Sequence, residues 1–198
     1  MKIFDQFRQA SKRKRQNILT GWGIGIGIFI IILVVMALIP VVPYEVYRDE
    51  RRGVQMKYPA FWQVVDKPEG GAIVAFIAPK RTEMDVFNAN ANLTLAGLPP
   101  RISMRDQLNN TIIEQITGTF GENIKILSSE KAEVAGQTGY KLVYVGQAQG
   151  LENPLKYLHY WVVVEGRGVY IFTYAAREND FDYYLGMVNT MVKSWTIF

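Results

Sequence analysis

The sequence predicts an α+β fold: a single N-terminal transmembrane helix followed by an antiparallel β-sheet flanked by helices. Three observations support this prediction. Residues 18–39 form an uninterrupted apolar run without a charged residue. Short segments in which apolar and polar residues alternate recur after residue 44, and two later segments carry apolar residues at helical spacing. We therefore divide the chain into a basic tail at 1–17, a membrane span at 18–39, a proline-rich linker at 40–43 and a folded domain at 44–198.

The apolar run is long enough to cross a bilayer. A helix rises about 1.5 Å per residue, so roughly 20 apolar residues are needed to span the hydrocarbon. A cleaved signal peptide is the alternative, because it also begins with a basic region. The run exceeds the usual apolar core of a signal peptide, and Val35-Met36-Ala37 lacks a small residue at the first cleavage position. The sequence favours an uncleaved anchor.

A basic cluster predicts how the anchor is oriented. Lys12, Arg13, Lys14 and Arg15 lie just before the apolar run. Basic residues next to a membrane span are retained on the cytoplasmic side. We therefore expect a single-pass membrane protein with a cytoplasmic N-terminus and a periplasmic or lumenal C-terminal domain.

Four glycines alternate inside the predicted anchor. Gly21, Gly23, Gly25 and Gly27 make two overlapping G-x-x-x-G pairs. Small residues four apart let two helices approach closely in lipid, which predicts packing against the transmembrane helices of a partner. The alternative is that glycine is simply common in membrane helices, and the spacing does not decide between the two.

The linker places the domain close to the membrane. Pro40-Val41-Val42-Pro43 follows the apolar run directly. Proline favours extended chain at about 3.1 Å per residue, so the linker reaches only about 12 Å. This short, stiff tether is suited to a subunit that presses on the outer face of a membrane complex.

The net charge belongs to the tail rather than to the domain. Residues 1–43 hold six Lys and Arg against one Asp, a charge of +5, whereas residues 44–198 hold sixteen against seventeen Asp and Glu, a charge of −1. A near-neutral domain offers no electrostatic reason to propose nucleic acid as a partner. The absence of cysteine excludes disulfides, thiolate metal sites and a lipid-anchoring cysteine.

Strands and two helices are expected in the domain. Ser103 is expected to open the first helix with Asp106 in a capping box, and Gly118 and Gly121 to end it. Asn179 is expected to cap the last helix, with Asp182 in its first turn. That helix is expected to bury Phe181, Leu185, Val188, Val192 and Trp195.

Strands are expected at 44–48, 53–58, 72–78, 92–97, 124–134, 140–149, 155–165 and 169–175. The strand at 72–78 is expected to be covered on both faces, and hairpin turns are expected at 135–139 and 166–168.

Two features of the sequence could serve as a metal-binding or catalytic site, a single histidine and a polar segment at 85–92. His159 is the single histidine and lies between large apolar neighbours, so a hydrogen-bonded structural role is favoured over a ligand or a base. Oxygen-bearing residues recur at alternate positions in 85–92. An EF-hand loop begun at Asn88 would need Gly at its sixth and Glu at its twelfth position, where Leu93 and Pro99 stand, so a polar loop leading into a strand is favoured. We expect no catalytic residues, metal or cofactor.

The order of several short motifs resembles a known family. Residues 53–62 read Gly-Val-Gln-Met-Lys-Tyr-Pro-Ala-Phe-Trp, a strand that ends in Tyr-Pro with a tryptophan three residues later. Further motifs follow in the order Ala75-Phe76, the strand at 92–95, the helix after Pro99-Pro100, Gly136 before Tyr140, the strand at 168–175, and Lys193-Ser194-Trp195. This series resembles the PsbP-like domain family, the extrinsic photosystem II subunit PsbP and its bacterial relatives, over nearly all of 44–198.

The resemblance implies a fold and a type of function. It implies a central antiparallel sheet flanked by helices, and a non-enzymatic accessory protein on the lumenal or periplasmic face of a photosynthetic membrane complex. The chain departs from the plant form in having an anchor, and from lipid-anchored bacterial relatives in lacking the lipobox cysteine. Two functions stay open: an accessory subunit of a membrane complex, and a tethered binding module for a small ligand or ion. An enzyme is disfavoured because no nucleophile and base can be paired.

Overall fold

The computed structural model describes residues 42–68, 70–83, 85–97, 105–147 and 150–198, with the backbone alone at 105–108. The chain divides into two compact units, Met1–Val42 and Pro43–Phe198, and the described residues belong almost wholly to the second. The predicted anchor, its four glycines and the basic cluster lie outside the described residues. No helix within the described ranges is long and apolar enough to cross a membrane.

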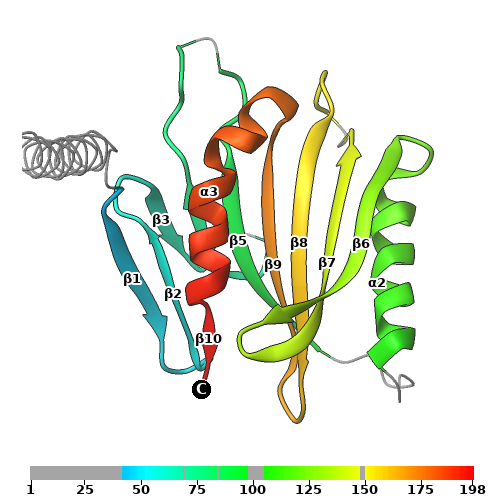
Figure 1. Cartoon of the computed structure of the whole chain (residues 1–198). Coiled ribbons are helices and arrows are strands. Elements are labelled where there is room, and N and C mark those ends of the chain that lie inside the picture. Colours follow the sequence, from blue (N-terminus) through cyan, green and yellow to red (C-terminus); the bar gives the residue numbers. More distant parts are fainter. Residues whose placement is uncertain (1–41, 69, 84, 98–104, 148–149) are drawn as a thin grey trace, which may run out of the picture. The chain divides into compact units, whose positions relative to one another are not determined.

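The described part of the chain forms an α+β domain, as predicted (Figure 1). Its elements are β1 (Tyr44–Asp49), β2 (Val54–Pro59), β3 (Gln63–Asp66), β4 (Ala72–Ile77), β5 (Asn90–Ala96), α2 (Arg105–Phe120), β6 (Ile124–Val134), β7 (Gln137–Gly146), β8 (Leu155–Val164), β9 (Gly168–Arg177), α3 (Glu178–Ser194) and β10 (Thr196–Ile197). Seven strands pair in the order β3-β4-β5-β9-β8-β7-β6, and every neighbouring pair is antiparallel. A second sheet has the order β1-β2-β10.

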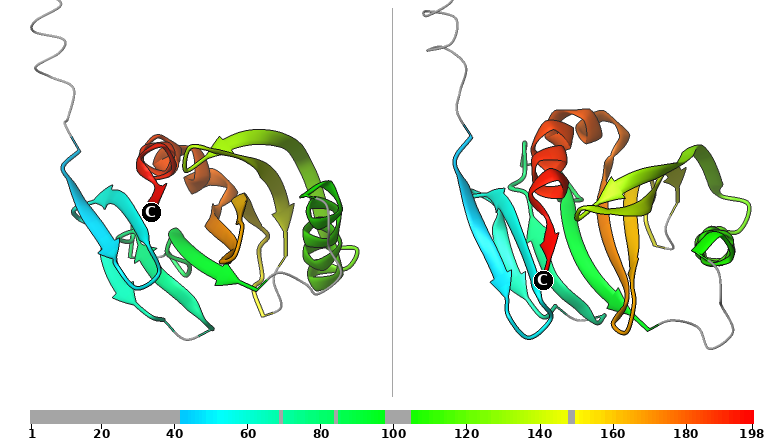
Figure 2. Two further views of the ribbon diagram at one scale, coloured as in Figure 1. Left: turned by 90° about the horizontal axis from the view of Figure 1, so that it is seen from below. Right: turned by 60° about the horizontal axis from the view of Figure 1, so that its bottom comes forward.

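The two faces of the large sheet are covered by different helices. Side chains alternate between the faces of a strand, so each strand supplies both layers. Helix α3 covers one face over β8 and β9, and α2 covers the other near β6 and β7 (Figures 1 and 2). Buried residues of β9 and α3 in the first layer are Tyr170, Phe172, Tyr174, Ala176, Phe181, Tyr184, Val188, Met191 and Val192. Buried residues of the second layer are Ile112, Leu142, Tyr144, Leu155, Tyr157, Trp161, Val169 and Ala175. Burying one large apolar side chain contributes roughly 1.5–3 kcal/mol, so both layers stabilise the fold.

The helix boundaries differ from the prediction. Helix α2 continues through Gly118 to Phe120, and only Gly121, with φ of +58°, ends it. The predicted start at Ser103 lies outside the described residues. Asn179 does not cap α3: the N-cap is Arg177, which makes no side-chain capping bond. The helix begins at Glu178, so its first-turn acidic residues are Glu178 and Asp180, and Asp182 lies beyond that turn. The predicted buried side of α3 is confirmed except at Leu185, which is only partly buried.

The strands also show three differences. Strands β3 and β10 were not predicted, because segments of four and two residues are too short to show a period. Strand β4 is not covered on both faces, since Ala72, Ala75 and Ile77 stay partly exposed. The turn expected at 135–139 contains only two residues, Ala135 and Gly136, both with positive φ, so β7 begins at Gln137.

The last residues of the chain approach the start of β2 closely at a glycine. The Phe198 N–H donates to the Gly53 carbonyl at 2.9 Å, and Arg167 Nη1 donates to the Phe198 main-chain oxygen at 2.6 Å. Gly53 has φ of +61°, and a Cβ atom there would overlap the Phe198 oxygen. The close approach of the C-terminus to β2 therefore needs a residue without a side chain.

We expect Gly53→Ala to destabilise the domain more than Gly136→Ala does. Both positions have positive φ, which costs an alanine about 1–2 kcal/mol, but a Cβ at Gly136 would meet nothing within 4 Å. The overlap at Gly53 should add roughly 1–3 kcal/mol. Urea unfolding of the full chain in mild detergent, followed by tryptophan fluorescence, measures both losses. Equal losses would show that the C-terminus moves aside at no cost.

Candidate functional site

The strand register gathers several loops at one end of the domain. The Ala60 N–H donates to the Pro43 carbonyl at 2.9 Å, which fixes the start of the domain beside the β2–β3 turn. Gln63 pairs with Ile77, Asn90 with Ala175, and Leu155 with Arg177. The β4–β5 loop, the β7–β8 loop and the first turn of α3 therefore share this end, which is at the top of Figure 1. We call it the Pro43 end.

An ion network around two buried carboxylates links the β4–β5 loop to the start of α3 at the Pro43 end. Asp85 of the β4–β5 loop and Asp180 of α3 are each only 6% exposed. Arg177 bridges them: its Nε donates to Asp180 Oδ2 at 2.8 Å, and its Nη2 donates to Asp85 Oδ1. Arg81 Nη1 donates to the second oxygen of Asp180 at 2.7 Å. Each buried carboxylate thus has a guanidinium partner, as burial of charge requires.

Asp85 also organises its own loop. Its carboxylate accepts the backbone N–H groups of Arg81 at 2.8 Å and Thr82 at 3.1 Å, and the Thr82 hydroxyl at 2.9 Å. Burial alone would raise the pKa of Asp85, but the hydrogen bonds from Thr82, Arg81 and Arg177 outweigh burial and lower the pKa to about 2. Asp85 is therefore ionised at neutral pH and serves as a fixed anchor for the loop.

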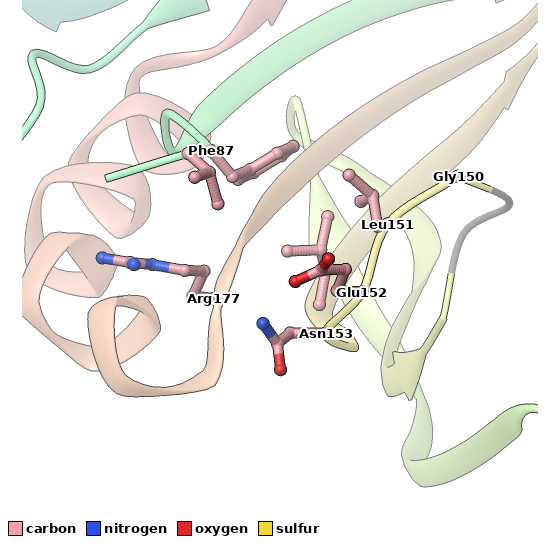
Figure 3. Close-up of a pocket in the computed structure, with 8 residues that line it drawn as sticks. Phe87, Gly150, Leu151, Glu152, Asn153 and Arg177 are labelled. Carbon is pink, nitrogen blue, oxygen red and sulfur yellow. The ribbon is translucent and has the colours of Figure 1, made fainter. Parts of the chain in front are cut away.

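A cavity of about 280 Å³ opens beside this network (Figure 3). Its wall is apolar at Val86, Phe87, Leu151 and Leu155, and polar at Glu152, Asn153 and Arg177. In Figure 3 the guanidinium of Arg177 turns away from Glu152 and Asn153, in keeping with its bonds to Asp85 and Asp180. The cavity thus offers one carboxylate and one amide beside an apolar wall, a combination typical of small-molecule sites.

His159 lies on the other side of the sheet, in the layer covered by α2. Its Nε2 is 3.2 Å from the Tyr144 hydroxyl and its Nδ1 is 3.3 Å from the Thr173 hydroxyl, so the predicted hydrogen-bonded environment is confirmed. The ring of Tyr144 stacks on His159 at 5.5 Å. Burial lowers the pKa of His159 to about 4, which keeps the imidazole neutral at physiological pH.

The polar loop predicted at 85–92 is also confirmed. Asn88 donates its side-chain amide to the Ala78 carbonyl at 3.1 Å, and Asn90 donates to the Asn88 carbonyl at 3.0 Å. These contacts shape the entry into β5. Over the part of the chain that the structure describes, no three His, Asp or Glu side chains gather to hold a metal ion.

The sequence analysis did not identify the roles of Arg81, Arg177 and Asp180. Arg177 contacts Asp85 across 92 residues, and Arg81 contacts Asp180 across 99. No local pattern signals such pairs. The four glycines at 21–27 and the basic residues at 12–15 lie outside the described residues, so their predicted roles stay predictions.

Comparison with known proteins identifies the same fold elsewhere. Residues 43–197 match the family model described as PsbP. The structure is similar to cyanobacterial PsbP (CyanoP) from Synechocystis sp. PCC 6803, with a TM-score of 0.58 and 17% identity over 81% of this chain and 96% of that one. It is similar to LpqN of Mycobacterium tuberculosis, involved in cell envelope biogenesis, with a TM-score of 0.55 and 12% identity over 78% and 85%. The Saccharomyces cerevisiae Ran-binding protein Mog1p follows, with a TM-score of 0.50 and 8% identity over 79% and 96%. No curated protein matches the sequence.

We expect Asp85→Asn to reduce the dependence of the unfolding free energy on pH in the acidic range. Because the folded pKa lies below the usual value, ionised Asp85 stabilises the fold above about pH 4, and this stabilisation is lost as the pH falls towards about 2. The gap in unfolding free energy between wild type and variant should therefore narrow between about pH 5 and pH 2. Urea unfolding across this range measures the gap. Asp182→Asn, which removes an exposed carboxylate from α3, is the matched charge-removing control.

We expect His159→Gln to remove a different pH dependence. The unfolded imidazole binds a proton below about pH 6.5, whereas the folded one stays neutral down to about pH 4, so acid favours unfolding over this interval. Wild type should lose up to about 3 kcal/mol more than the variant between these pH values. Tyr144→Phe keeps the buried histidine, so a pH dependence over this interval should remain in that variant. A variant with the wild-type slope would mean that another group titrates.

Proposed function

Because the chain belongs to the PsbP family, we propose that it is a non-enzymatic accessory subunit on the periplasmic or lumenal face of a membrane protein complex. The observation that carries the proposal is the position of the family match. It covers 43–197 and begins four residues after the apolar run at 18–39. The anchor, in this proposal, brings the domain to the complex, and the domain covers its outer face.

A non-catalytic role is supported by the fold and by the site. One protein with this fold, Mog1p, is described as Ran-binding. The cavity beside Arg177 is lined by a carboxylate, an amide and apolar side chains, which are groups that bind. His159, the side chain best suited to proton transfer, is held neutral between two hydroxyls in the layer that α2 covers.

A photosynthetic complex is the partner to test first. The family is named for PsbP, and the cyanobacterial PsbP of Synechocystis has the highest TM-score of the three structures described above. The fold alone does not select this partner, because it is shared with an envelope protein and a Ran-binding protein. In the proposed arrangement Gly21, Gly23, Gly25 and Gly27 pack against helices of the complex, and Lys12–Arg15 stay in the cytoplasm.

We expect the full chain to copurify with other membrane proteins after mild detergent extraction from native membranes. Replacing Gly23 and Gly27 together by Leu should reduce the yield of these partners severalfold, since bulky side chains prevent close helix contact. Replacing Ile24 and Ile28 by Leu keeps the apolar volume and is the matched control. Mass spectrometry of the purified material identifies and quantifies the partners. Recovery of the chain alone, as a monomer, would contradict the proposal.

A second function, a tethered binding module for a small ligand or ion, is favoured by one observation. The cavity of about 280 Å³ approaches the size of small-molecule sites, and Glu152 and Asn153 line it together with apolar side chains. In this case the chain would be a monomer in detergent and would lose binding when Glu152 and Asn153 are replaced by Ala. The copurification experiment therefore separates the two functions.

A further inference from the structure

We propose that the Pro43 end of the domain is itself a lipid-contacting surface, which reaches the headgroup region of a neutral or zwitterionic bilayer through Phe61, Val86 and Tyr183. The inference rests on the proposed function, because it requires the anchor at 18–39. In this proposal the domain contacts the membrane directly through these side chains, in addition to its attachment through the linker.

Exposed apolar side chains gather at this end. Val86 is 86% exposed, Tyr183 58% and Phe61 46%, and each belongs to a different element of the Pro43 end. Exposed apolar residues scattered singly are normal on a protein surface, whereas a group of them marks a contact site. The contacts of the neighbouring residues show how the three elements are connected.

A chain of contacts connects them. Trp62, next to Phe61, lies with its ring centroid 5.5 Å from Tyr184, whose ring is 4.8 Å from that of Tyr183. The guanidinium of Arg81 lies 4.4 Å above the Tyr183 ring. The same loop continues to Asp85, which Arg177 holds, and then to Val86. The elements that carry the three exposed side chains are therefore linked by contacts at the Pro43 end.

The length of the linker brings this surface to the bilayer. The apolar run ends at Ile39, and four extended residues span at most about 14 Å. Pro43 is fixed to Ala60 by a hydrogen bond, so the turn that carries Phe61 cannot swing away from the linker. The headgroup region of each leaflet is roughly 5–8 Å thick. The linker can therefore extend beyond the headgroups by no more than about 10 Å, so Phe61 is within reach of them, and the proposal is that it contacts them.

The side-chain chemistry indicates which lipids fit. Tyrosine places its apolar ring and its hydroxyl at the membrane interface, and an exposed valine and phenylalanine supply apolar contact. Residues 78–89, 150–156 and 177–183 carry four Lys and Arg against six Asp and Glu. An acidic excess opposes anionic headgroups, so the contact should be apolar and should not need anionic lipid.

Site-directed fluorescence on the full chain tests the inference. The chain has no cysteine, so single substitutions accept one environment-sensitive dye each. We would compare Phe61→Cys and Val86→Cys with Thr138→Cys and Glu165→Cys, exposed positions near the β6–β7 and β8–β9 turns at the opposite end. Each variant is reconstituted into phosphatidylcholine vesicles with and without nitroxide-labelled lipid, and incorporation is checked by flotation after an alkaline wash.

We expect the dyes at 61 and 86 to lose roughly half of their emission or more, because interfacial side chains lie within about 5–10 Å of the acyl boundary. The dyes at 138 and 165 should be almost unchanged, and added anionic lipid should not increase the quenching. Equal quenching at both ends, or none at 61 and 86 in chains that float with the vesicles, would overturn the inference and leave the accessory function intact. Chains that do not float would instead contradict the anchor.

Discussion

The central strand β9 has to bury both of its faces, and this constraint organises the domain. Tyr170, Phe172 and Tyr174 point to the layer under α3, while Val169 and Ala175 point to the layer that α2 covers. A strand with two apolar faces is stable only when a layer packs on each side. Because β9 pairs with β5 on one side and β8 on the other, covering it also fixes the neighbours on which the helices rest.

The same strand determines where the loops meet. Antiparallel pairing puts the end of β9 beside the starts of β5 and β8. Arg177 is the last residue of β9, so its guanidinium emerges where the β4–β5 loop and the first turn of α3 also lie. Two buried carboxylates, Asp85 and Asp180, converge on it. The ion network is thus a consequence of strand order, and it joins the β4–β5 loop to the junction between β9 and α3.

Elements with their own periodic pattern could be predicted from the sequence, whereas features created by distant contacts could not. The apolar stripe of α3 and the alternation in β2 are local, and both were predicted correctly. Strand β10 has two residues and exists because Ile197 pairs with Val54 of β2. Asn179 has the side chain of a cap, yet Arg177 takes that position as the last residue of β9. In each of these errors a tertiary contact outweighed a local preference.

The candidate site also contains residues that could be recognised from the sequence and residues whose roles depend on distant contacts. His159 was recognisable because it is the single histidine, and its hydrogen-bonded environment followed from its apolar neighbours. Arg81 has no such mark in the sequence, and its role depends on a contact 99 residues away.

Proteins that share this fold carry names as different as Ran-binding and cell envelope biogenesis. A core that fills both faces of the sheet leaves the loops at its ends free to vary, so one scaffold can serve several partners. In this chain the end that a four-residue linker joins to the apolar run is also the end that exposes Val86 and Tyr183. In the proposed arrangement that surface lies near a bilayer, and lipid contact would then give a physical reason for exposed apolar side chains that contribute nothing to the core.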